Sequence, residues 1–254
     1  MANYSTNELM AVCAAMRLKD GMNVAVGLGL PQMACFLAKA THAPDMNMFY
    51  ELGVYNPVPV DTGLDLADPR IWYNSDYYTG FIGALGEILQ GGRVDVGFLG
   101  ALQTDQFGNL NSTLVRKPDG SIRHFTGSGG AADIANLSKN VFIILKHEPR
   151  KIAAKLDYLT SVGCYQGGKS RTEKGIPATA GVTVFTNLCV MQTGAESGRL
   201  ELRSLHPGVT LDTLRENTGF DLIVPKDYEA TPEPDPEYLR VLREVIDPRK
   251  IYIK

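Results

Sequence analysis

The spacing of apolar and polar residues along the chain predicts helices that alternate with short strands. Ser5 and Glu8 have the spacing of a capping box, which predicts a helix that begins there and ends at Gly21. Continuous apolar runs predict buried strands, and apolar residues at helical spacing predict the helices between them. The predicted strands are residues 23–27, 47–50, 94–101, 141–145, 158–163, 182–186 and 200–205, and the other predicted helices are 32–39, 81–90, 211–217 and 236–245.

This alternation predicts an α/β fold with an open, mixed, largely parallel sheet and helices on both faces. The texture of the chain changes near Lys155, but no Pro- or Ser-rich linker marks that point. The Pro-rich segment at residues 231–236 is typical of a rigid surface connection. We therefore expect residues 1–254 to form a single domain.

Composition and charge narrow the class of protein. The chain has 254 residues, 44% of them hydrophobic, and a net charge of −3, which excludes a disordered chain and a binder of nucleic acid through a basic face. No apolar run reaches the roughly 20 residues of a membrane span, and the residues before Leu9 lack the basic start of a secretory signal. The expected location is the cytoplasm. The four cysteines and four histidines have no spacing that indicates disulfides or a metal site.

Glycine is unusually frequent, with 26 residues, and two clusters invite an interpretation as a nucleotide site. Gly27-Leu-Gly29-Leu-Pro31 lies between a predicted strand and a helix, but Gln32 stands at the third fingerprint position. Gly127-Ser-Gly129-Gly130-Ala-Ala fits a dinucleotide fingerprint, yet no strand directly precedes it. These glycines serve either as turns or as positions where a ligand contacts bare peptide N–H groups.

Glu51 is the carboxylate that attracts most attention. It follows the short apolar strand at residues 47–50, and α/β folds place ligands at the carboxyl ends of their strands. A solvated surface glutamate is the ordinary alternative. The segment from Asp105 to Asn111, taken alone, is typical of a turn.

Taken together and in order, these stretches make the chain resemble the family I CoA-transferases, and among them the second (B) subunits of the glutaconate type. The resemblance covers nearly the whole chain and implies the CoA-transferase (NagB/RpiA-like) fold. The matching stretches are Gly27-Leu-Gly29-Leu-Pro31, Tyr50-Glu51-Leu-Gly53, the run from Gly100 to Asn111, Phe125-Thr-Gly127-Ser-Gly129-Gly130-Ala131, and Glu216-Asn-Thr-Gly-Phe-Asp221.

The resemblance implies that Glu51 is the nucleophile of a ping-pong reaction between an acyl-CoA and a carboxylic acid. The intermediates would be an acyl-glutamyl anhydride and a glutamyl-CoA thioester. Coenzyme A is then a substrate, and neither a tightly bound cofactor nor a metal is expected. The implied partner is an A-type subunit, in a hetero-oligomer. The residues implied to line the substrate and CoA site are Gly127, Gly129 and Gly130, with Gly27, Gly29 and Gly53.

Two alternatives stay open, and one departure from the family pattern supports the first of them. Leu52 stands where these enzymes often have Asn or Ser, which leaves the acyl group undecided. One alternative is a hydrolase of the same scaffold that cleaves a ring or another C–C bond in an acyl-CoA. The other is a non-catalytic partner subunit or a sugar-phosphate binder, for which Lys146 and Arg150 are the nearest basic candidates. If the CoA-transferase interpretation holds, Val at Gly129 or Gly130 abolishes turnover while the chain still folds.

Overall fold

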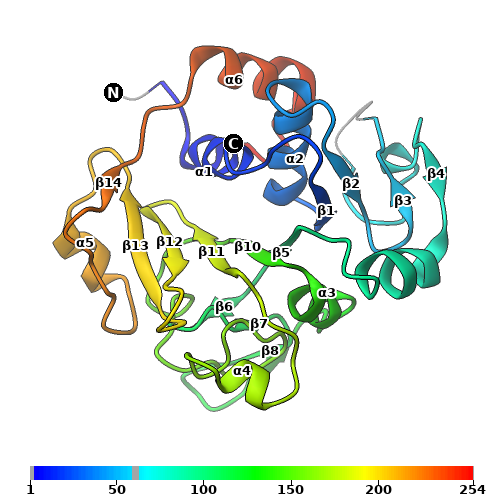
Figure 1. Ribbon diagram of the computed structural model, residues 1–254. Helices are drawn as coiled ribbons and strands as arrows, with labels where there is room; N and C mark the ends of the chain where they lie inside the picture. Colours follow the sequence, from blue (N-terminus) through cyan, green and yellow to red (C-terminus); the bar gives the residue numbers. More distant parts are fainter. Residues whose placement is uncertain (1–2, 59–62, 254) are drawn as a thin grey trace. The chain divides into compact units, whose positions relative to one another are not determined.

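The computed structural model describes residues 3–58 and 63–253, which form two compact units (Figure 1). The first unit comprises Met1–Leu99 and Glu233–Lys254, and the second comprises Gly100–Pro232. Each unit contains parallel and antiparallel strands together with helices, so the predicted α/β class with a mixed sheet is confirmed. The prediction of a single domain over residues 1–254 stays a prediction.

The sheet strands of the first unit follow the order β5-β1-β2-β3-β4. The strand β1 lies between β5 and β2 and is parallel to both, whereas β3 is antiparallel to β2 and β4 is antiparallel to β3. The carboxyl ends of β5, β1 and β2 therefore meet at one edge. The bounds are β1 Asn23–Val26, β2 Asn47–Phe49, β3 Val54–Tyr55, β4 Tyr77–Tyr78 and β5 Val96–Gly100.

Helices cover both faces of these strands. The helix α2 (Leu30–Ala40) packs on β1, and α1 (Thr6–Ala15), α6 (Pro236–Val241) and η3 (Leu242–Ile246) pack with it. The helix α2 connects β1 to β2, and η2 (Ile82–Leu89) connects β4 to β5 in the opposite direction along the sheet. Crossovers between parallel strands are right-handed as a rule. As a result α2 and η2 lie on opposite faces (Figure 1). A short 3₁₀ turn, η1 (Pro69–Ile71), precedes β4.

The predicted capping box at the start of α1 is confirmed. The Ser5 N–H donates to Glu8 Oε2 at 2.7 Å, and the Glu8 N–H donates to Ser5 Oγ at 3.3 Å. Arg243 on η3 also donates to Glu8, from Nε at 2.5 Å and from Nη2 at 2.9 Å. Burial acts to raise the pKa of Glu8, but the hydrogen bonds from Arg243 and Ser5 outweigh it and lower the pKa. The ionised Glu8 carboxylate thus joins the two sequence segments of the first unit.

The second unit has its own five sheet strands, in the order β14-β13-β12-β11-β10. Only β10–β11 and β13–β14 are parallel pairs, because β12 runs antiparallel to both of its neighbours. Two small hairpins, β6–β7 and β8–β9, precede them. The bounds are β6 Gln103–Thr104, β7 Leu110–Asn111, β8 Leu114–Arg116, β9 Ile122–His124, β10 Asn140–Ile144, β11 Gly181–Phe185, β12 Cys189–Thr193, β13 Leu200–Leu205, β14 Glu229–Ala230, α3 Ala131–Leu137, α4 Ser170–Glu173 and α5 Leu211–Glu216.

Three local predictions differ from the structure. The strand expected at residues 158–163 is wrong, because this irregular segment only bridges to the two-residue strand β7 through Leu110. The strand β12 was not predicted; Thr186 makes its turn by accepting the N–H groups of Leu188 and Cys189 at 3.1 Å each. The helix expected at residues 81–90 exists as η2, but it has π-type hydrogen bonds, such as Gln90 N–H to the Leu85 carbonyl at 3.1 Å.

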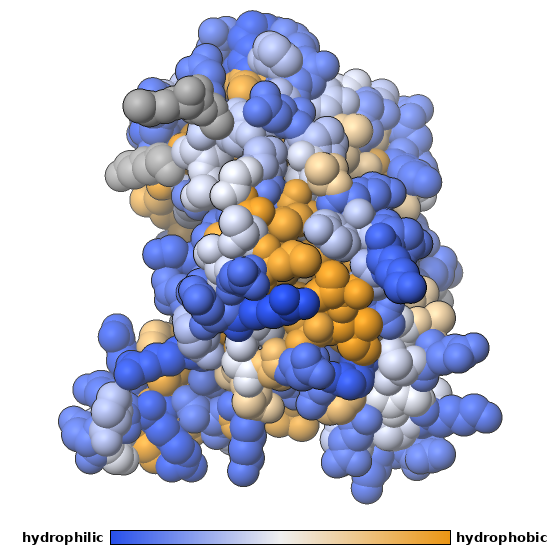
Figure 2. Space-filling model, turned by 90° about the vertical axis from the view of Figure 1, so that its left-hand side faces the viewer, coloured by the Kyte–Doolittle hydropathy of each residue, from blue (hydrophilic) through white to orange (hydrophobic). Residues whose placement is uncertain are grey.

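The helices, the reactive side chains and the surface add four observations. No helix of the described residues is long and apolar enough to cross a membrane, and no cluster of His, Cys, Asp and Glu within them could hold a metal ion. All four cysteines are free thiols. On the face shown in Figure 2, apolar side chains gather near the middle and hydrophilic ones surround them.

The second unit buries a neutral histidine in its core. His147 Nε2 lies 2.9 Å from Thr218 Oγ1, whose hydroxyl donates to the Leu214 carbonyl at 2.7 Å, so Nε2 is assigned the proton. His147 Nδ1 lies 3.0 Å from Thr186 Oγ1. Burial, with a smaller contribution from His206, lowers the pKa of His147 from 6.5 to about 4. Folding therefore opposes the binding of a second proton, which would make the ring positively charged.

We expect acid to destabilise the protein through His147. An unfolded histidine binds a proton as the pH falls below 6.5, whereas the folded ring binds one only near pH 4. The stabilisation is thus complete above pH 6.5 and is lost as the pH falls toward 4, with a loss of about 2 kcal/mol at pH 5. Urea unfolding at pH 7.5 and pH 5 measures it. His147→Gln should lose about 2 kcal/mol less on acidification than the wild type, and exposed His124→Gln should lose as much as the wild type. An equal loss in all three proteins contradicts the assignment.

Candidate functional site

Glu51 lies in a tight turn that joins β2 to β3, at the edge where β1 and β2 end. The Gly53 N–H donates to the Tyr50 carbonyl at 2.8 Å, and the Tyr50 N–H donates to the Val54 carbonyl at 3.0 Å. Glu51 and Leu52 are the central residues of this turn, and both side chains are half-buried. A carboxylate with this exposure is reachable by a ligand at the carboxyl end of the parallel strands.

Gly53 is required by both its backbone angle and its neighbour. Its φ is +89°, a left-handed value that favours glycine. A Cβ at this position would lie 2.1 Å from the backbone nitrogen of Gly80. The Thr79 N–H also donates to the Gly53 carbonyl at 2.9 Å, which binds the turn to the end of β4. Gly53 therefore shapes the turn of Glu51 and shows no feature of a ligand contact.

Gly27 and Gly29 form the turn between β1 and α2. The Gly27 N–H donates to the Phe98 carbonyl on β5 at 3.0 Å, and a Cβ at Gly27 would lie 3.2 Å from that oxygen. Gly29 has φ +82° and starts α2, and a Cβ there would lie 3.8 Å from the Tyr252 ring. Gly27 comes two residues after Ala25 and Glu51 two residues after Phe49, and Ala25 and Phe49 are register partners. Gly27 and Glu51 thus leave the sheet at one edge.

Gly127, Gly129 and Gly130 form a loop of the second unit that leads into α3. Gly127 has φ +83° and is held by Ser112, whose Oγ donates to the Gly127 carbonyl at 2.8 Å. Gly129 has φ +49° and is exposed. Gly130 is buried and has φ −78°, a value that other residues adopt readily. Backbone geometry therefore requires glycine at 127 and 129 but not at 130.

The predicted site residues divide between the two units. Glu51, Gly53, Gly27 and Gly29 belong to the first unit, where the turns after β1 and β2 bring them to one edge. Gly127, Gly129 and Gly130 belong to the second unit, in the single loop before α3. Their role in binding CoA stays a prediction.

The run from Asp105 to Asn111 contains the predicted turn, in which the Gly108 N–H donates to the Asp105 carbonyl at 3.0 Å, and it also forms a buried polar network. Asp105 Oδ1 accepts the N–H groups of Phe107 at 2.9 Å and Asn109 at 3.1 Å. The Asn111 amide donates to Gln103 Oε1 and to the Leu114 carbonyl, each at 2.6 Å. Burial raises the pKa of Asp105 even though these hydrogen bonds oppose the shift. Residues of this motif thus hold backbone segments together, which accounts for their chemistry without a ligand.

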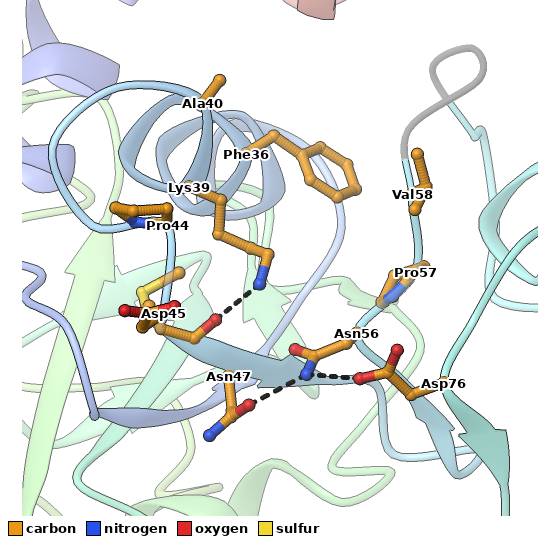
Figure 3. Close-up of a pocket in the computed structure, with 11 residues that line it drawn as sticks. Phe36, Lys39, Ala40, Pro44, Asp45, Asn47, Asn56, Pro57, Val58 and Asp76 are labelled. Carbon is orange, nitrogen blue, oxygen red and sulfur yellow. Dashed lines mark hydrogen bonds between the residues drawn. The ribbon is translucent and has the colours of Figure 1, made fainter.

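A pocket of about 500 Å³ opens at the other edge of the first unit, beside the first residue of β2, Asn47 (Figure 3). The Lys39 ammonium donates to the Met46 carbonyl at 2.6 Å, and burial lowers the pKa of Lys39. The Asn56 amide donates to Asn47 Oδ1 and Asp76 Oδ2, each at 2.9 Å. None of the predicted site residues lines this pocket, and the hydrogen bonds of Lys39 and Asn56 are made to other residues of its lining.

Sequence reasoning missed the buried polar residues beneath the Glu51 turn. Tyr50 Oη donates to Gln32 Oε1 at 2.8 Å, and both side chains are fully buried. Burial raises the pKa of Tyr50 well above its usual value, so its hydroxyl stays protonated. The sequence pattern places Tyr50 in an apolar strand and in the stretch that matches the family, and it places Gln32 at the start of a helix, but it does not bring the two side chains together. The available signal was a glutamine in the first turn of a helix that the pattern predicts to be buried.

Comparison with known proteins assigns the family. The family model described as Coenzyme A transferase matches residues 7–217. The chain belongs to the coenzyme A transferase family. The predicted resemblance is therefore confirmed at the level of the family.

Two relatives match this family member over almost its whole length. The chain is 41% identical over 247 residues to the B subunit of the 3-oxoadipate CoA-transferase of Pseudomonas knackmussii, over 96% of this chain and 94% of the relative. It is 35% identical over 260 residues to the B subunit of the glutaconate CoA-transferase of Acidaminococcus fermentans, over 99% of this chain and 96% of the relative. The solved structure of the glutaconate enzyme matches with a TM-score of 0.92 and 32% identity, over 100% of this chain and 98% of that chain.

A third relative has a different reaction in its name. The cholesterol ring-cleaving hydrolase IpdB subunit of Rhodococcus jostii is 30% identical over 165 residues, which are 65% of this chain and 64% of the relative. Among these three relatives, the shared length and identity are greatest for the two CoA-transferase subunits.

Gly53→Ala should damage the Glu51 turn far more than Gly80→Ala. Both glycines have positive φ, +89° and +73°, so each alanine costs about 1 kcal/mol in backbone strain. Only at Gly53 does a Cβ meet a backbone, whereas nothing lies within 4 Å of one at Gly80. We expect Gly53→Ala to lower the free energy of unfolding by at least about 3 kcal/mol and Gly80→Ala by about 1 kcal/mol in urea titrations. Equal losses contradict the steric assignment.

Proposed function

We propose that this chain is the B subunit of a CoA-transferase that moves CoA between an acyl-CoA and a carboxylic acid through Glu51. The observation that carries the proposal is a half-buried glutamate in a glycine-closed turn at the carboxyl edge of parallel strands, in a member of the coenzyme A transferase family. In α/β folds that edge is where ligands bind.

A carboxylate nucleophile suits this reaction. Glu51 attacks the thioester carbonyl of the acyl-CoA, which forms an acyl-glutamyl anhydride and releases CoA thiolate. The thiolate then attacks the glutamyl carbonyl, which forms a glutamyl-CoA thioester and releases the first acid. A second acid reverses both steps and leaves as its CoA thioester, while Glu51 returns to a carboxylate. Serine or cysteine could take the acyl group, but neither has a carbonyl that could carry CoA.

The loop before α3 is the proposed source of hydrogen-bond donors. Gly129 is exposed, so its backbone is open to a ligand, and a glycine there leaves room for a thioester. Peptide N–H groups in such loops stabilise oxyanions that develop during acyl transfer. Gly127 is proposed to hold the loop in place, because its carbonyl accepts a hydrogen bond from Ser112 Oγ.

The proposed acid is a short dicarboxylate. The names 3-oxoadipate and glutaconate, carried by the two long relatives, both denote dicarboxylic acids. Leu52, beside Glu51 in the turn and half-buried, offers an apolar contact to the carbon chain of the acyl group. We do not propose specificity for glutaconate, because the 3-oxoadipate relative is the more similar of the two.

The proposed partner is an A-type subunit, in a hetero-oligomer. Both long relatives are named as the B subunits of their enzymes. Large apolar side chains are exposed next to the Glu51 turn, on β4 and at the start of η2, where Ile82 is 80% exposed. A covering subunit would remove this apolar surface from water and shield the reactive intermediates from hydrolysis. The exposed side chains are those of Tyr77, Tyr78, Phe81 and Ile82.

A hydrolase is the second candidate function, favoured by the partial match to the ring-cleaving relative. A hydrolase consumes the acyl-CoA at the same rate with or without an acceptor acid. A transferase depends on the acceptor. Steady-state rates with acetyl-CoA, succinyl-CoA or glutaconyl-CoA as donor, each with and without a dicarboxylate, therefore separate the two reactions. If the chain is instead non-catalytic, changing Glu51 leaves the rate of the complex unchanged.

Glu51→Gln should abolish turnover, because it keeps the shape of the side chain and removes the nucleophile. We expect the rate of the complex purified with its A-type subunit to fall at least roughly 1000-fold. Hydroxylamine added after acyl-CoA should modify Glu51 in the wild type, detected by peptide mass analysis, and should modify no residue in the variant. Glu87→Gln, an exposed glutamate on η2 of the same unit, should keep full activity. An unmodified Glu51 in an active wild-type complex refutes the proposal.

Gly129→Ala should lower turnover without unfolding the chain. A methyl group there narrows the space proposed for the thioester, and valine at Gly129 or Gly130 should abolish turnover. Gly120→Ala is the matched control, because Gly120 is also exposed, has φ +82° and has nothing within 4 Å of a Cβ. Both alanines should cost about 1 kcal/mol of stability. We expect only Gly129→Ala to reduce the rate, by about tenfold or more. Full activity in Gly129→Ala contradicts its role at the site.

A further inference from the structure

A buried pair of hydrogen-bonded side chains lies beneath the turn that carries Glu51. Tyr50 Oη donates to Gln32 Oε1 at 2.8 Å, and neither side chain is exposed to solvent. Gln32 belongs to the first turn of α2, and Tyr50 directly precedes Glu51. The bond therefore ties the end of β2 to the start of the helix that packs on β1.

The pair continues to a second anchor. Gln32 Nε2 donates to the Gly63 carbonyl at 3.2 Å, and Tyr252 Oη donates to the same carbonyl at 3.0 Å. Tyr252 is itself held, because Asp247 accepts its backbone N–H at 2.8 Å. Three separate segments of the first unit thus fix the position of the Gln32 amide. A polar group held from several sides in a dry environment is a rigid support.

Tyr50 is also the residue whose backbone closes the turn. Its carbonyl accepts the Gly53 N–H at 2.8 Å, and its N–H donates to the Val54 carbonyl at 3.0 Å. A rotation of the Tyr50 backbone would therefore move Glu51, which follows it, relative to the edge of the sheet. The hydrogen bond to Gln32 opposes such a rotation from the side-chain end.

We infer that Gln32 and Tyr50 are positioning residues, which hold the Glu51 carboxylate in the orientation needed for attack on the thioester. The inference rests on the proposed function, in which Glu51 is the nucleophile. Misplacement of a reacting group by about 1 Å can lower a rate roughly 100-fold, so one lost hydrogen bond under the turn has a measurable effect. Neither side chain is expected to touch the substrate, because both are fully buried.

The test compares two tyrosine-to-phenylalanine variants of one hairpin, in the complex with the A-type subunit. Tyr50→Phe removes the bond to Gln32. Tyr55→Phe removes a bond of 3.1 Å to Asn23 Oδ1, made from β3 toward the first residue of β1, at the edge opposite Glu51. We expect Tyr50→Phe to lower kcat and the single-turnover rate of CoA attachment to Glu51 by about tenfold, with KM within about twofold of the wild type. Tyr55→Phe should keep both rates.

Gln32→Met keeps the hydroxyl of Tyr50 and removes its hydrogen-bond acceptor. It therefore tests the same hydrogen bond if Tyr50→Phe folds poorly. Gln32→Met also removes the hydrogen bond from Gln32 to the Gly63 carbonyl. We expect at least the same loss of kcat, and the double variant should lose about as much as Gln32→Met alone, because both changes break the Tyr50–Gln32 hydrogen bond. Urea midpoints of all variants report the purely structural cost. If wild-type Glu51 receives no CoA, the proposed function itself fails. If wild-type Glu51 receives CoA and Tyr50→Phe and Gln32→Met attach it at the wild-type rate, or Tyr55→Phe slows it equally, the positioning role is wrong.

Discussion

The backbone contact between Gly53 and Gly80 determines how the edge of the first unit is built. A side chain at Gly53 would overlap the backbone of Gly80, so the turn after β2 approaches the end of β4 only because the side chain is missing. That approach lets the Thr79 N–H bond to the Gly53 carbonyl and brings β4 onto β3. The turn, the hairpin and the edge strand are consequently one rigid feature. The Glu51 carboxylate therefore projects from a backbone that has little freedom to move.

Helices and strands that are marked by neighbouring residues in the sequence were predicted well. Features that depend on pairing between distant segments were not. The capping box of Ser5 and Glu8 and the apolar runs of β1, β2, β5, β10, β11 and β13 are legible because each depends on neighbouring residues. The strand β12 (Cys189–Thr193) was not recognised because its apolar residues end at Met191 and the polar residues Gln192 and Thr193 follow without alternation. The strand predicted at residues 158–163 is the opposite kind of error. This segment has β propensity but no long partner strand, so it forms only an isolated bridge. The mixture of antiparallel pairs in the second unit follows from that missed hairpin.

The candidate site shows the same division. Glu51 could be placed at a strand end from the sequence, because the apolar residues before it define the strand. Gln32 could not be linked to Tyr50, which lies 18 residues away, since no pattern within one sequence tells which buried polar groups meet. The motif from Gln103 to Asn111 is informative in another way. It helps to identify the family, yet its amides and carboxylate form hydrogen bonds with one another and with backbone groups of the same unit. Recognition of the family therefore depends largely on residues that stabilise the fold, while the proposed chemistry depends on one carboxylate.

The first unit is assembled from two segments that are distant in the sequence, Met1–Leu99 and Glu233–Lys254. The Arg243–Glu8 ion pair and the packing of η3 on α2 join these segments. During synthesis on the ribosome the second unit is therefore complete before the first one can be. The turn with Glu51 is synthesised early, but it lacks η3 and the anchor at Tyr252 until the segment Glu233–Lys254 has been synthesised. A chain cut after residue 232 would hold every residue of the second unit but would leave the Glu51 turn without η3 and without the anchor at Tyr252.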